Sequence, residues 1–377
     1  MLEFVIPCLL GLESLVGDEI RKLGLSDVRV ENGRVLCRGE ARDIARLNIN
    51  LRCGARVILV LHKFRATDFE SLFQGVRAVH WEDWIPREGE FPVVGYSINS
   101  TLHSVPACQS IVKKAVVDRL SAAYGIAQFP ETGRRYQVRF SIMKDEVTVG
   151  LDTSGEGLYK RGYRAHGVAA PLKETLAAAM VKLSHYNGRD PFCDPFCGSG
   201  TIPIEAALIA RNQAPGMYRR FTAEAFPWVD LSLWGDVRTE MRDKEFKGFY
   251  HILASDNDPK CVSLAMANAK KAAVDRLITF QDGDATKMSL PSDEGIFICN
   301  PPYGQRMMEQ QSAQRLYAAL GRHLKYADGW KKYIITSEPE FEHYFGKRAD
   351  KKRKLYNGMI KCDYYMYFNG NGKDRKK

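Results

Sequence analysis

Hydrophobic and polar positions in the first part of the chain follow two different periods, which mark out short strands and helices. Apolar residues occupy every second position in a half-buried strand, and every third or fourth position in an amphipathic helix. The elements predicted in this way are strands at 4–7, 28–30 and 35–38, and helices at 12–23 and 41–51. Together they indicate a small α+β unit over residues 1–52.

A second α+β module is expected over residues 53–155. Apolar runs rich in β-branched and aromatic residues predict buried strands at 56–64 and 91–99. Apolar residues alternate with polar ones on both sides of Lys144-Asp145, which predicts a β-hairpin at 136–151. A helix at 106–124 completes the module.

The pattern changes after residue 155. Residues 156–170 are rich in glycine and show no period, so we expect a linker between domains there. From 171 to 377 strands alternate with helices, a pattern typical of α/β proteins with a doubly wound, largely parallel sheet. The expected strands of this domain are 192–194, 250–256, 278–282, 295–300 and 332–336.

Composition excludes several classes of protein. The 377 residues are 45% hydrophobic and 27% charged, as in an ordinary soluble protein, and no apolar run is long enough to span a membrane. Glu3 stands where a secretory signal would carry basic residues. Nine scattered cysteines predict reduced thiols in the cytoplasm. Cys193 and Cys197 are closely spaced, but no second cysteine pair or histidine cluster accompanies them, so we expect no metal site.

The balance of charge points to a polyanionic partner. A net charge of +10 favours nucleic acid, because lysine and arginine release counterions when they neutralise phosphates. Lys113 and Lys114 lie on the polar face of the helix at 106–124, and Lys351 and Lys352 belong to a basic run near the C-terminus. The alternative is that these lysines form a solvated surface with no partner.

A glycine-containing turn follows the first strand of the doubly wound domain. In Asp194-Pro-Phe-Cys-Gly198-Ser-Gly200-Thr, the two glycines allow a tight turn and close approach of the backbone to a ligand. A dinucleotide fingerprint would require a third glycine where Pro203 stands. Asp194 is suited instead to the methionine ammonium of S-adenosylmethionine, although a purely structural turn is the simpler alternative.

Acidic residues end the next two strands of the expected sheet. Asp256 is placed to accept both hydroxyls of a ribose, whereas Asp258 precedes Pro259 and is the expected N-cap of a helix. Asp282 and Asp284 follow the third strand, and either carboxylate could accept a hydrogen bond from the adenine amino group. We favour Asp284 for that contact.

The sequence Asn300-Pro301-Pro302-Tyr303 ends the fourth strand and carries the most specific chemistry in the chain. An exocyclic amine of a nucleobase is a poor nucleophile, so a catalyst gains by accepting hydrogen bonds from its N–H groups. The Asn300 side-chain oxygen and the Pro301 carbonyl suit this role, and the prolines fix the backbone in advance. The Tyr303 ring can stack on a base that has been flipped or is already unpaired. A simple turn after a strand is the alternative.

In this order, these motifs resemble those of class I N-methyltransferases that act on amino groups of nucleobases. Leu158–Arg164 and Ala170–Ala179 are similar to the entry segment of the THUMP-containing RNA guanine-N2 methyltransferases, and residues 1–155 resemble that family's ferredoxin-like and THUMP modules. The resemblance covers nearly the whole chain. It implies a Rossmann-like methyltransferase domain over 171–377, preceded by a ferredoxin-like unit at 1–52 and a THUMP domain at 53–155.

The resemblance also implies roles for individual residues. The methionine end of S-adenosylmethionine would lie beside Leu172, Lys173, Glu174 and Thr175, above Asp194, Phe196, Gly198, Gly200 and Thr201. Asp256 would hold the ribose and Asp284 the adenine, while Asn300, Pro301 and Tyr303 would hold the target guanine, with Asn300 also in contact with the cofactor. The basic segment before this domain adds Arg161 and Arg164 to the candidate RNA contacts.

Several alternatives remain at this stage. Relatives of this type methylate large-subunit (23S) ribosomal RNA, and others methylate transfer RNA. A DNA adenine or cytosine amino-methyltransferase and a non-catalytic RNA-binding factor are further alternatives. The long aromatic insertion at 211–248 could form a lid, pack as core or contact RNA. The sequence leaves the oligomeric state open.

Overall fold

The computed structural model describes residues 1–164, 172–303 and 307–368. Within these ranges the chain forms two compact units. Unit 1 comprises residues 1–8, 16–158 and 220–238, and unit 2 comprises residues 9–15, 159–219 and 239–377. The boundary near 158 falls inside the predicted linker, whose residues 165–170 lie outside the described ranges. Residues 9–15 group with unit 2, although they lie within the range expected for the N-terminal unit. Residues 220–238 group with unit 1, although they lie within the range expected for the methyltransferase domain.

Unit 1 is built on one seven-stranded sheet with the order β2-β3-β1-β4-β7-β6-β5. Its elements are β1 (Leu2–Pro7), α1 (Glu13–Lys22), β2 (Ser26–Glu31), β3 (Arg34–Gly39), α2 (Ala41–Asn50), β4 (Ile58–Arg65), α3 (Phe69–Arg77), β5 (Val93–Ile98), α4 (Val105–Tyr124), β6 (Val138–Met143) and β7 (Glu146–Asp152). Neighbouring strands are antiparallel except β5 and β6, which are parallel. This confirms an α+β module, whose two predicted parts share one continuous sheet.

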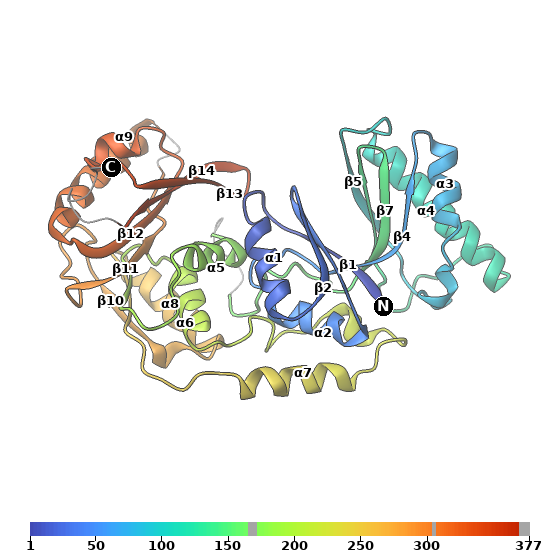
Figure 1. Ribbon diagram of the computed structural model, residues 1–377, viewed down its shortest axis with the longest axis horizontal. Helices are drawn as coiled ribbons and strands as arrows, with labels where there is room; N and C mark the ends of the chain where they lie inside the picture. Colours follow the sequence, from blue (N-terminus) through green and yellow to red (C-terminus); the bar gives the residue numbers. More distant parts are fainter. Residues whose placement is uncertain (165–171, 304–306, 369–377) are drawn as a thin grey trace. The chain divides into compact units, whose positions relative to one another are not determined.

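The predicted hairpin and the predicted amphipathic helix are both present in unit 1. Lys144 and Asp145 have φ angles of 53° and 65°, as a type I′ turn between β6 and β7 requires. Helix α4 buries Val112, Ala115, Val116 and Leu120 along one stripe and packs beside α3 (Figure 1). Helix α3 itself was not predicted.

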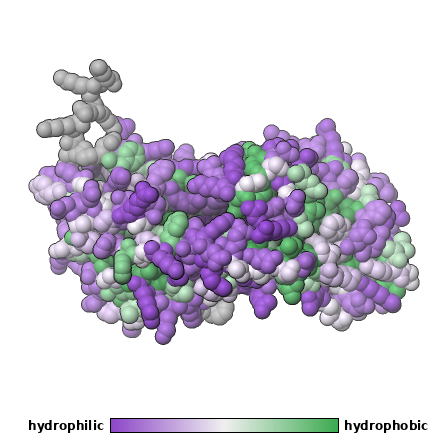
Figure 2. All heavy atoms as spheres, turned by 60° about the horizontal axis from the view of Figure 1, so that its bottom comes forward, coloured by the Kyte–Doolittle hydropathy of each residue, from purple (hydrophilic) through white to green (hydrophobic). Residues whose placement is uncertain are grey.

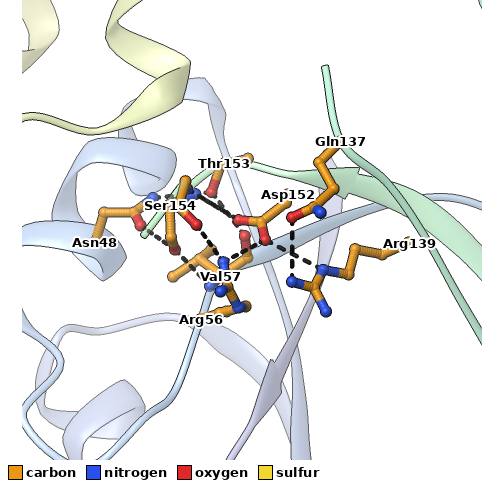
Figure 3. Close-up of polar contacts among 9 residues, drawn as sticks. Asn48, Arg56, Val57, Gln137, Arg139, Asp152, Thr153 and Ser154 are labelled. Carbon is orange, nitrogen blue, oxygen red and sulfur yellow. Dashed lines mark hydrogen bonds and ion pairs between the residues drawn. The ribbon is translucent and has the colours of Figure 1, made fainter. Parts of the chain in front are cut away.

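A buried polar network fixes the end of β7 against α2, β4 and β6 (Figure 3). The Asp152 carboxylate accepts hydrogen bonds from Arg56 at 2.7 Å and from Arg139 at 3.2 Å. Its other oxygen accepts the backbone N–H groups of Ser154 and Gly155. Because a buried carboxylate needs compensating donors, this network ties the two halves of the sheet into a single unit.

The central part of the aromatic insertion, residues 220–238, packs in unit 1. Phe226 is buried against Tyr136, with ring centroids 4.7 Å apart. The Trp228 indole donates a hydrogen bond to the Trp84 carbonyl at 3.1 Å, and the two indoles meet edge to face. Arg134 also donates to the Ala225 carbonyl. Of the three alternatives for this insertion, packing as core describes residues 220–238.

Unit 2 is built on a second seven-stranded sheet with the order β10-β9-β8-β11-β12-β14-β13. Its strands are β8 (Phe192–Asp194), β9 (Ile252–Asp256), β10 (Ile278–Asp282), β11 (Glu294–Cys299), β12 (Gly329–Thr336), β13 (Lys351–Asn357) and β14 (Ile360–Tyr367). Strands β8 to β12 are parallel, whereas β14 runs antiparallel to both β12 and β13. This confirms the doubly wound sheet and adds a C-terminal hairpin that was not predicted.

Helices cover this sheet and complete its core. They are α5 (Glu174–Leu183), α6 (Thr201–Ala210), α8 (Pro259–Lys271), α9 (Met307–His323) and α10 (Phe341–Phe345). The remaining helix, α7 (Ser232–Asp243), lies within the insertion, and its residues 232–238 belong to unit 1. Tyr317 of α9 and Phe341 of α10 are fully buried with Phe297 of β11 and Tyr365 of β14. This aromatic cluster packs against β11 and β12.

The visible surface is largely polar, and the cysteines are free thiols. Hydrophilic side chains cover most of the face shown in Figure 2, with hydrophobic groups scattered among them. All nine cysteines lie in the described ranges and none is in a disulfide. Within those ranges, no helix combines the length and the apolar character that crossing a membrane requires.

Candidate active site

One cavity of unit 2 gathers most of the residues that the motifs single out. It has a volume of about 630 Å³ and opens at the carboxyl ends of β8, β9 and β11. Its lining residues are Leu172, Lys173, Asp194, Phe196, Cys197, Gly198, Ser199, Thr201, Ile202, Asp256, Asn257, Cys261, Leu264, Asn300, Pro301, Pro302, Tyr303, Asn357, Gly358 and Ile360. Ligands of open α/β sheets bind at this edge, so the cavity is the candidate active site.

The glycine turn adopts the conformation that its sequence suggests. Gly198 and Gly200 have φ angles of 51° and 83°, in the region that favours glycine. A Cβ at Gly198 would meet no atom, so its backbone is open on that side, whereas a Cβ at Gly200 would lie 2.9 Å from the Cβ of Ala265. Gly198 therefore leaves room for a ligand, and Gly200 allows α6 and α8 to pack closely.

Asp194 is a buried acid with one oxygen unsatisfied. Its Oδ1 accepts the Phe196 backbone N–H at 3.1 Å, and its Oδ2 has no hydrogen-bond partner among the described residues. Burial raises the pKa of this carboxyl well above 3.8, and the nearby Asp256 carboxylate adds to the rise. A cation in the cavity would relieve this cost, so the site fits a ligand with an ammonium group.

Asp256 lies against the glycine turn, as the sheet order requires. Its Oδ2 accepts the Gly198 backbone N–H at 2.9 Å, and its Oδ1 accepts the Asp258 N–H at 3.1 Å. The carboxylate still borders the cavity, where it could accept a ribose hydroxyl. Asp258 caps α8 through a bond from the Lys260 N–H, with Pro259 at the first helical position, which confirms the predicted cap.

The two candidate adenine contacts, Asp282 and Asp284, are not among the residues that line the cavity. Asp284 accepts hydrogen bonds from the backbone N–H and the hydroxyl of Thr286, and these bonds lower its pKa. Asp282 is the last residue of β10 and is exposed. An adenine contact by either residue stays a prediction, and at Asp284 it would compete with a turn that the side chain already closes.

Arg164, one of the two arginines expected to contact RNA, instead bonds residues at and just before the start of α5. Arg164 donates to the Leu172 carbonyl and the Thr201 hydroxyl, and its Nε lies 3.3 Å from the Glu174 carboxylate. Burial raises the pKa of Glu174. Leu172 and Lys173 line the cavity, whereas Glu174 and Thr175 are buried in the first turn of α5. Arg164 thus supports the cofactor side of the cavity.

Arg161, also expected to contact RNA, is buried. Its side chain is 2% exposed and lies 3.4 Å from the Glu205 carboxylate of α6, which also accepts the Tyr163 hydroxyl. A buried guanidinium in an ion pair cannot reach a phosphate without unfolding its surroundings. The described geometry therefore gives Arg161 and Arg164 structural roles in place of the expected RNA contacts.

The Asn-Pro-Pro-Tyr segment is held by two tyrosines. The Tyr303 hydroxyl donates to Asn300 Oδ1 at 2.5 Å, and the buried Tyr317 hydroxyl donates to the Pro302 carbonyl at 2.6 Å. Burial raises the pKa of Tyr303, so its hydroxyl keeps its proton and remains a donor. Asn300 Oδ1 has a second lone pair, which leaves it able to accept a further N–H from a ligand in the cavity.

Three residues of the cavity come from a hairpin that the sequence analysis missed. Asn357, Gly358 and Ile360 belong to the turn between β13 and β14. Gly358 occupies the first central position of this turn, and a glycine followed by one residue is a signal of a two-residue hairpin turn that could have revealed it. The basic run just before it hid the strand, because lysine and arginine are poor indicators of a strand.

Two cysteines near the cavity are poor nucleophiles. Burial raises the pKa of Cys197, and burial raises that of Cys299 well above its usual value. Both thiols therefore stay protonated, in agreement with small buried residues of the core. No cluster of three potential metal ligands occurs in the part of the chain that the structure describes.

The candidate RNA lysines divide into two kinds. Lys113 donates to the Phe91 carbonyl at 3.1 Å, pairs with Glu131 at 2.6 Å and sits 3.5 Å above the Phe91 ring. Lys352 pairs with Glu342 at 2.8 Å. Lys114 and Lys351 are exposed. The first two lysines contribute to local structure, and the last two are free to meet a polyanion.

The fold and the cavity together define a class I methyltransferase, and comparison with known proteins assigns its family. A model described as RMKL-like, methyltransferase domain matches residues 161–366. An RlmL ferredoxin-like domain matches residues 3–58, and a THUMP domain matches residues 66–152. The chain belongs to the family of RMKL-like methyltransferases, with ferredoxin-like and THUMP domains in its N-terminal half.

Named relatives extend over the whole chain. The Bacillus subtilis (strain 168) protein named "Putative RNA methyltransferase YpsC" is 43% identical over 371 residues, which cover 98% of this chain and 96% of that protein. Ribosomal RNA large subunit methyltransferase K/L of Aliivibrio fischeri (strain ATCC 700601 / ES114) is 34% identical over 376 residues. The match covers 97% of this chain and 53% of that relative, so the chain spans about half the length of the K/L protein.

Solved structures support the fold and the cofactor. A "predicted N6-adenine-specific DNA methylase" from Listeria monocytogenes str. 4b F2365 is 43% identical, with a TM-score of 0.92 over 98% of this chain and 96% of that one. A "putative methyltransferase complexed with SAH" is 39% identical, with a TM-score of 0.90 over 99% of both chains. SAH, S-adenosylhomocysteine, is what S-adenosylmethionine becomes when it gives up its methyl group. The cofactor of this methyltransferase is S-adenosylmethionine.

Proposed function

We propose that this protein methylates the exocyclic N2 amino group of a guanine in RNA, with large-subunit ribosomal RNA as the first candidate. One observation carries the proposal. Asn300 and Tyr303 line the same cavity as Asp194 and Gly198, so a target amine and a methyl donor could meet there.

The proposed roles follow from the donors and acceptors in the cavity. The unsatisfied Asp194 oxygen would accept the methionine ammonium, and Asp256 would accept the ribose hydroxyls. When bound, the cofactor supplies an electrophilic methyl group. The free lone pair of Asn300 Oδ1, with the Pro301 carbonyl, would accept the N–H groups of guanine and turn the nitrogen lone pair toward that methyl group. The Tyr303 ring would stack on the base.

The choice of RNA rests on the N-terminal half and on charge. The chain carries a THUMP domain and a net charge of +10, which favours a polyanion. The names of the B. subtilis and A. fischeri relatives specify RNA and large-subunit ribosomal RNA, respectively. A cytoplasmic location belongs to the same proposal. Among the lysines expected to contact phosphates, Lys114 and Lys351 are exposed and form no ion pair within the described residues.

Transfer of a labelled methyl group to three nucleic acids tests the proposal. We expect the purified full chain to label undermethylated 23S ribosomal RNA more than transfer RNA or DNA, and mass spectrometry of the digested product to locate N2-methylguanosine. Asn300→Ala is the matched inactive variant. It removes an acceptor for the target amine and keeps Asp194 and Asp256, the proposed acceptors for the cofactor. Label found only in DNA, as adenine or cytosine methylation, would refute the RNA assignment.

The same preparation separates the remaining alternatives. Label in transfer RNA alone would move the target to that RNA and leave the chemistry unchanged. A non-catalytic RNA-binding factor would give no label in any substrate, and titration calorimetry with S-adenosylmethionine would then show no binding. Cofactor binding without any transfer would contradict the proposed substrates and retain the cofactor site.

A further inference from the structure

The turn between β13 and β14 projects an apolar side chain beside the candidate active site. Asn357 pairs with Ile360 across a two-residue turn, Gly358-Met359, and Gly358 has a φ angle of 66°. Glycine at the first central position is typical of a type II′ hairpin turn. Asn357, Gly358 and Ile360 line the cavity, whereas the Met359 side chain is 99% exposed. Met359 therefore stands at the rim of the cavity and points away from the protein.

Strand register gives this hairpin two chemically different faces. Asn357 pairs with Ile360 and Leu355 with Cys362, so these side chains share the face that borders the cavity. Lys354 pairs with Asp363 and Tyr356 with Lys361, and these residues share the opposite face. Lys354 and Lys361 are exposed and form no ion pair among the described residues. The apolar tip is thus flanked by two available cations.

We propose that this hairpin opens the RNA: Met359 fills the gap that the target nucleotide leaves in the base stack, and Lys354 and Lys361 hold the neighbouring phosphates. The inference rests on the proposed function, because only a nucleobase drawn from a stack into the cavity leaves such a gap. Enzymes that modify a base must take it out of the stack, and an apolar wedge between bases offsets part of that cost.

The properties of methionine and of the turn suit this role. A single exposed apolar residue is ordinary on a protein surface, so the argument lies in its position at the rim of the cavity. Methionine is unbranched and polarizable, and it adapts to flat aromatic surfaces such as bases. The turn that carries it closes a hydrogen-bonded ladder running into the sheet through β14 and β12, which resists displacement when RNA binds.

Paired and unpaired forms of one RNA test the inference. The probe is an RNA stem that carries the guanine mapped by the ribosomal RNA experiment, made once with that guanine paired and once with the opposite nucleotide abasic. We expect Met359→Ala to lower kcat/KM about tenfold on the paired stem, a modest share of the unstacking cost, and less than about twofold on the abasic stem. Met359→Leu should retain most of the activity on both stems.

Met266→Ala is the matched control, because Met266 is 51% exposed on α8 and is not among the residues that line the cavity. It should resemble the wild type on both stems. Equal kcat/KM of Met359→Ala and wild type on the paired stem would overturn the wedge, and so would an equal loss on both stems, which would indicate a contact with the base itself. If the wild type methylates neither stem, the proposed function fails instead, so the two failures are distinguishable.

Discussion

The hydroxyl of Tyr303 donates a hydrogen bond to the side-chain oxygen of Asn300 across 2.5 Å. Only Pro301 and Pro302 separate these two residues in the sequence. The two prolines hold the backbone so that the side chains of Asn300 and Tyr303 meet. This contact uses one lone pair of the Asn300 oxygen and fixes the direction of the other. Tyr303 is therefore a positioning residue for Asn300 as well as a candidate stacking surface.

Removing this hydroxyl should slow methyl transfer without weakening cofactor binding. We expect Tyr303→Phe to lower the single-turnover rate by about 3- to 10-fold, since a neutral hydrogen bond contributes about 0.5–1.5 kcal/mol. The ring remains, so KM for RNA should change little. Tyr326→Phe, at a tyrosine that is 82% exposed, is the control. An increase in KM with an unchanged single-turnover rate would contradict the positioning role.

Asp194 should destabilise the protein when no cofactor is bound and should strengthen cofactor binding. We expect Asp194→Asn to weaken binding of S-adenosylhomocysteine by about 10- to 100-fold, because a charge-assisted bond to the ammonium is lost. The same variant should unfold at a higher temperature than the wild type when no cofactor is present. Calorimetry with and without ligand measures both effects. A lower unfolding temperature for the cofactor-free variant than for the wild type would contradict the cost of burial assigned to the Asp194 carboxylate.

The stability effect of Asp194 should depend on pH in a definite direction. Burial raises the pKa of Asp194 in the folded protein well above 3.8, so the folded state holds this proton more tightly than the unfolded state. The cost of ionisation is absent below about pH 3.8 and grows as pH rises, until pH passes the folded-state pKa. The advantage of Asp194→Asn should therefore be larger at about pH 8 than at about pH 5.

The ion pair between Arg161 and Glu205 should matter for stability and not for RNA affinity. Arg161→Met leaves the Glu205 carboxylate buried without its cation, so we expect a loss of about 3–5 kcal/mol in the free energy of unfolding by urea. Adding Glu205→Leu should recover most of that loss. The matched control is Arg220→Met, since that side chain is 89% exposed and its loss should change stability by less than about 0.5 kcal/mol.

Phe226 should stabilise unit 1 although it lies within the methyltransferase half of the sequence. Its ring is buried against Tyr136, so Phe226→Ala should lower stability by about 3–5 kcal/mol. The substitution should destabilise unit 1, and faster hydrogen exchange of the backbone amides in β6 and β7 would show this. Cofactor affinity should remain as in the wild type. Loss of protection confined to the sheet of unit 2 would contradict the assignment of this segment to unit 1.

The two kinds of lysine should respond differently to substitution. Lys114→Ala and Lys351→Ala should each reduce the slope of log affinity against log salt for RNA by about 1, because each exposed ammonium would release a counterion. Lys113→Ala should instead reduce thermal stability, since its ammonium bonds Phe91 and Glu131. A reduced slope for Lys113→Ala with unchanged stability would reverse this division.

The features that were predictable from sequence are those fixed by local chemistry. Asp194, Gly198, Asp256 and Asn300 meet at one cavity because parallel strands end at a common edge, a rule that needs only the order of the elements. Asp258 caps its helix because Pro259 follows it. These inferences use a motif and its neighbours, with no knowledge of distant contacts.

The features that were missed depend on partners far away in the sequence. The residues around Arg161 in the sequence do not indicate its ion pair with the buried Glu205, 44 positions away. The basic stretch that contains Arg161 was therefore interpreted as an RNA contact. The aromatic residues of the insertion gave no period, because they pack against Tyr136 and Trp84 from another part of the chain. Strand β13 is rich in lysine because it lies at the edge of its sheet, where positive charge discourages pairing with other chains.

The route of the chain through unit 1 has a consequence for its synthesis. Residues 220–238 complete the core of that unit, yet they are translated after the strand β8 and the helix α6 of unit 2. At a translation rate of about 5–20 residues per second, the N-terminal half must wait several seconds on the ribosome with Tyr136 and Trp84 uncovered. Newborn chains should therefore present this aromatic surface to chaperones until residue 238 has emerged.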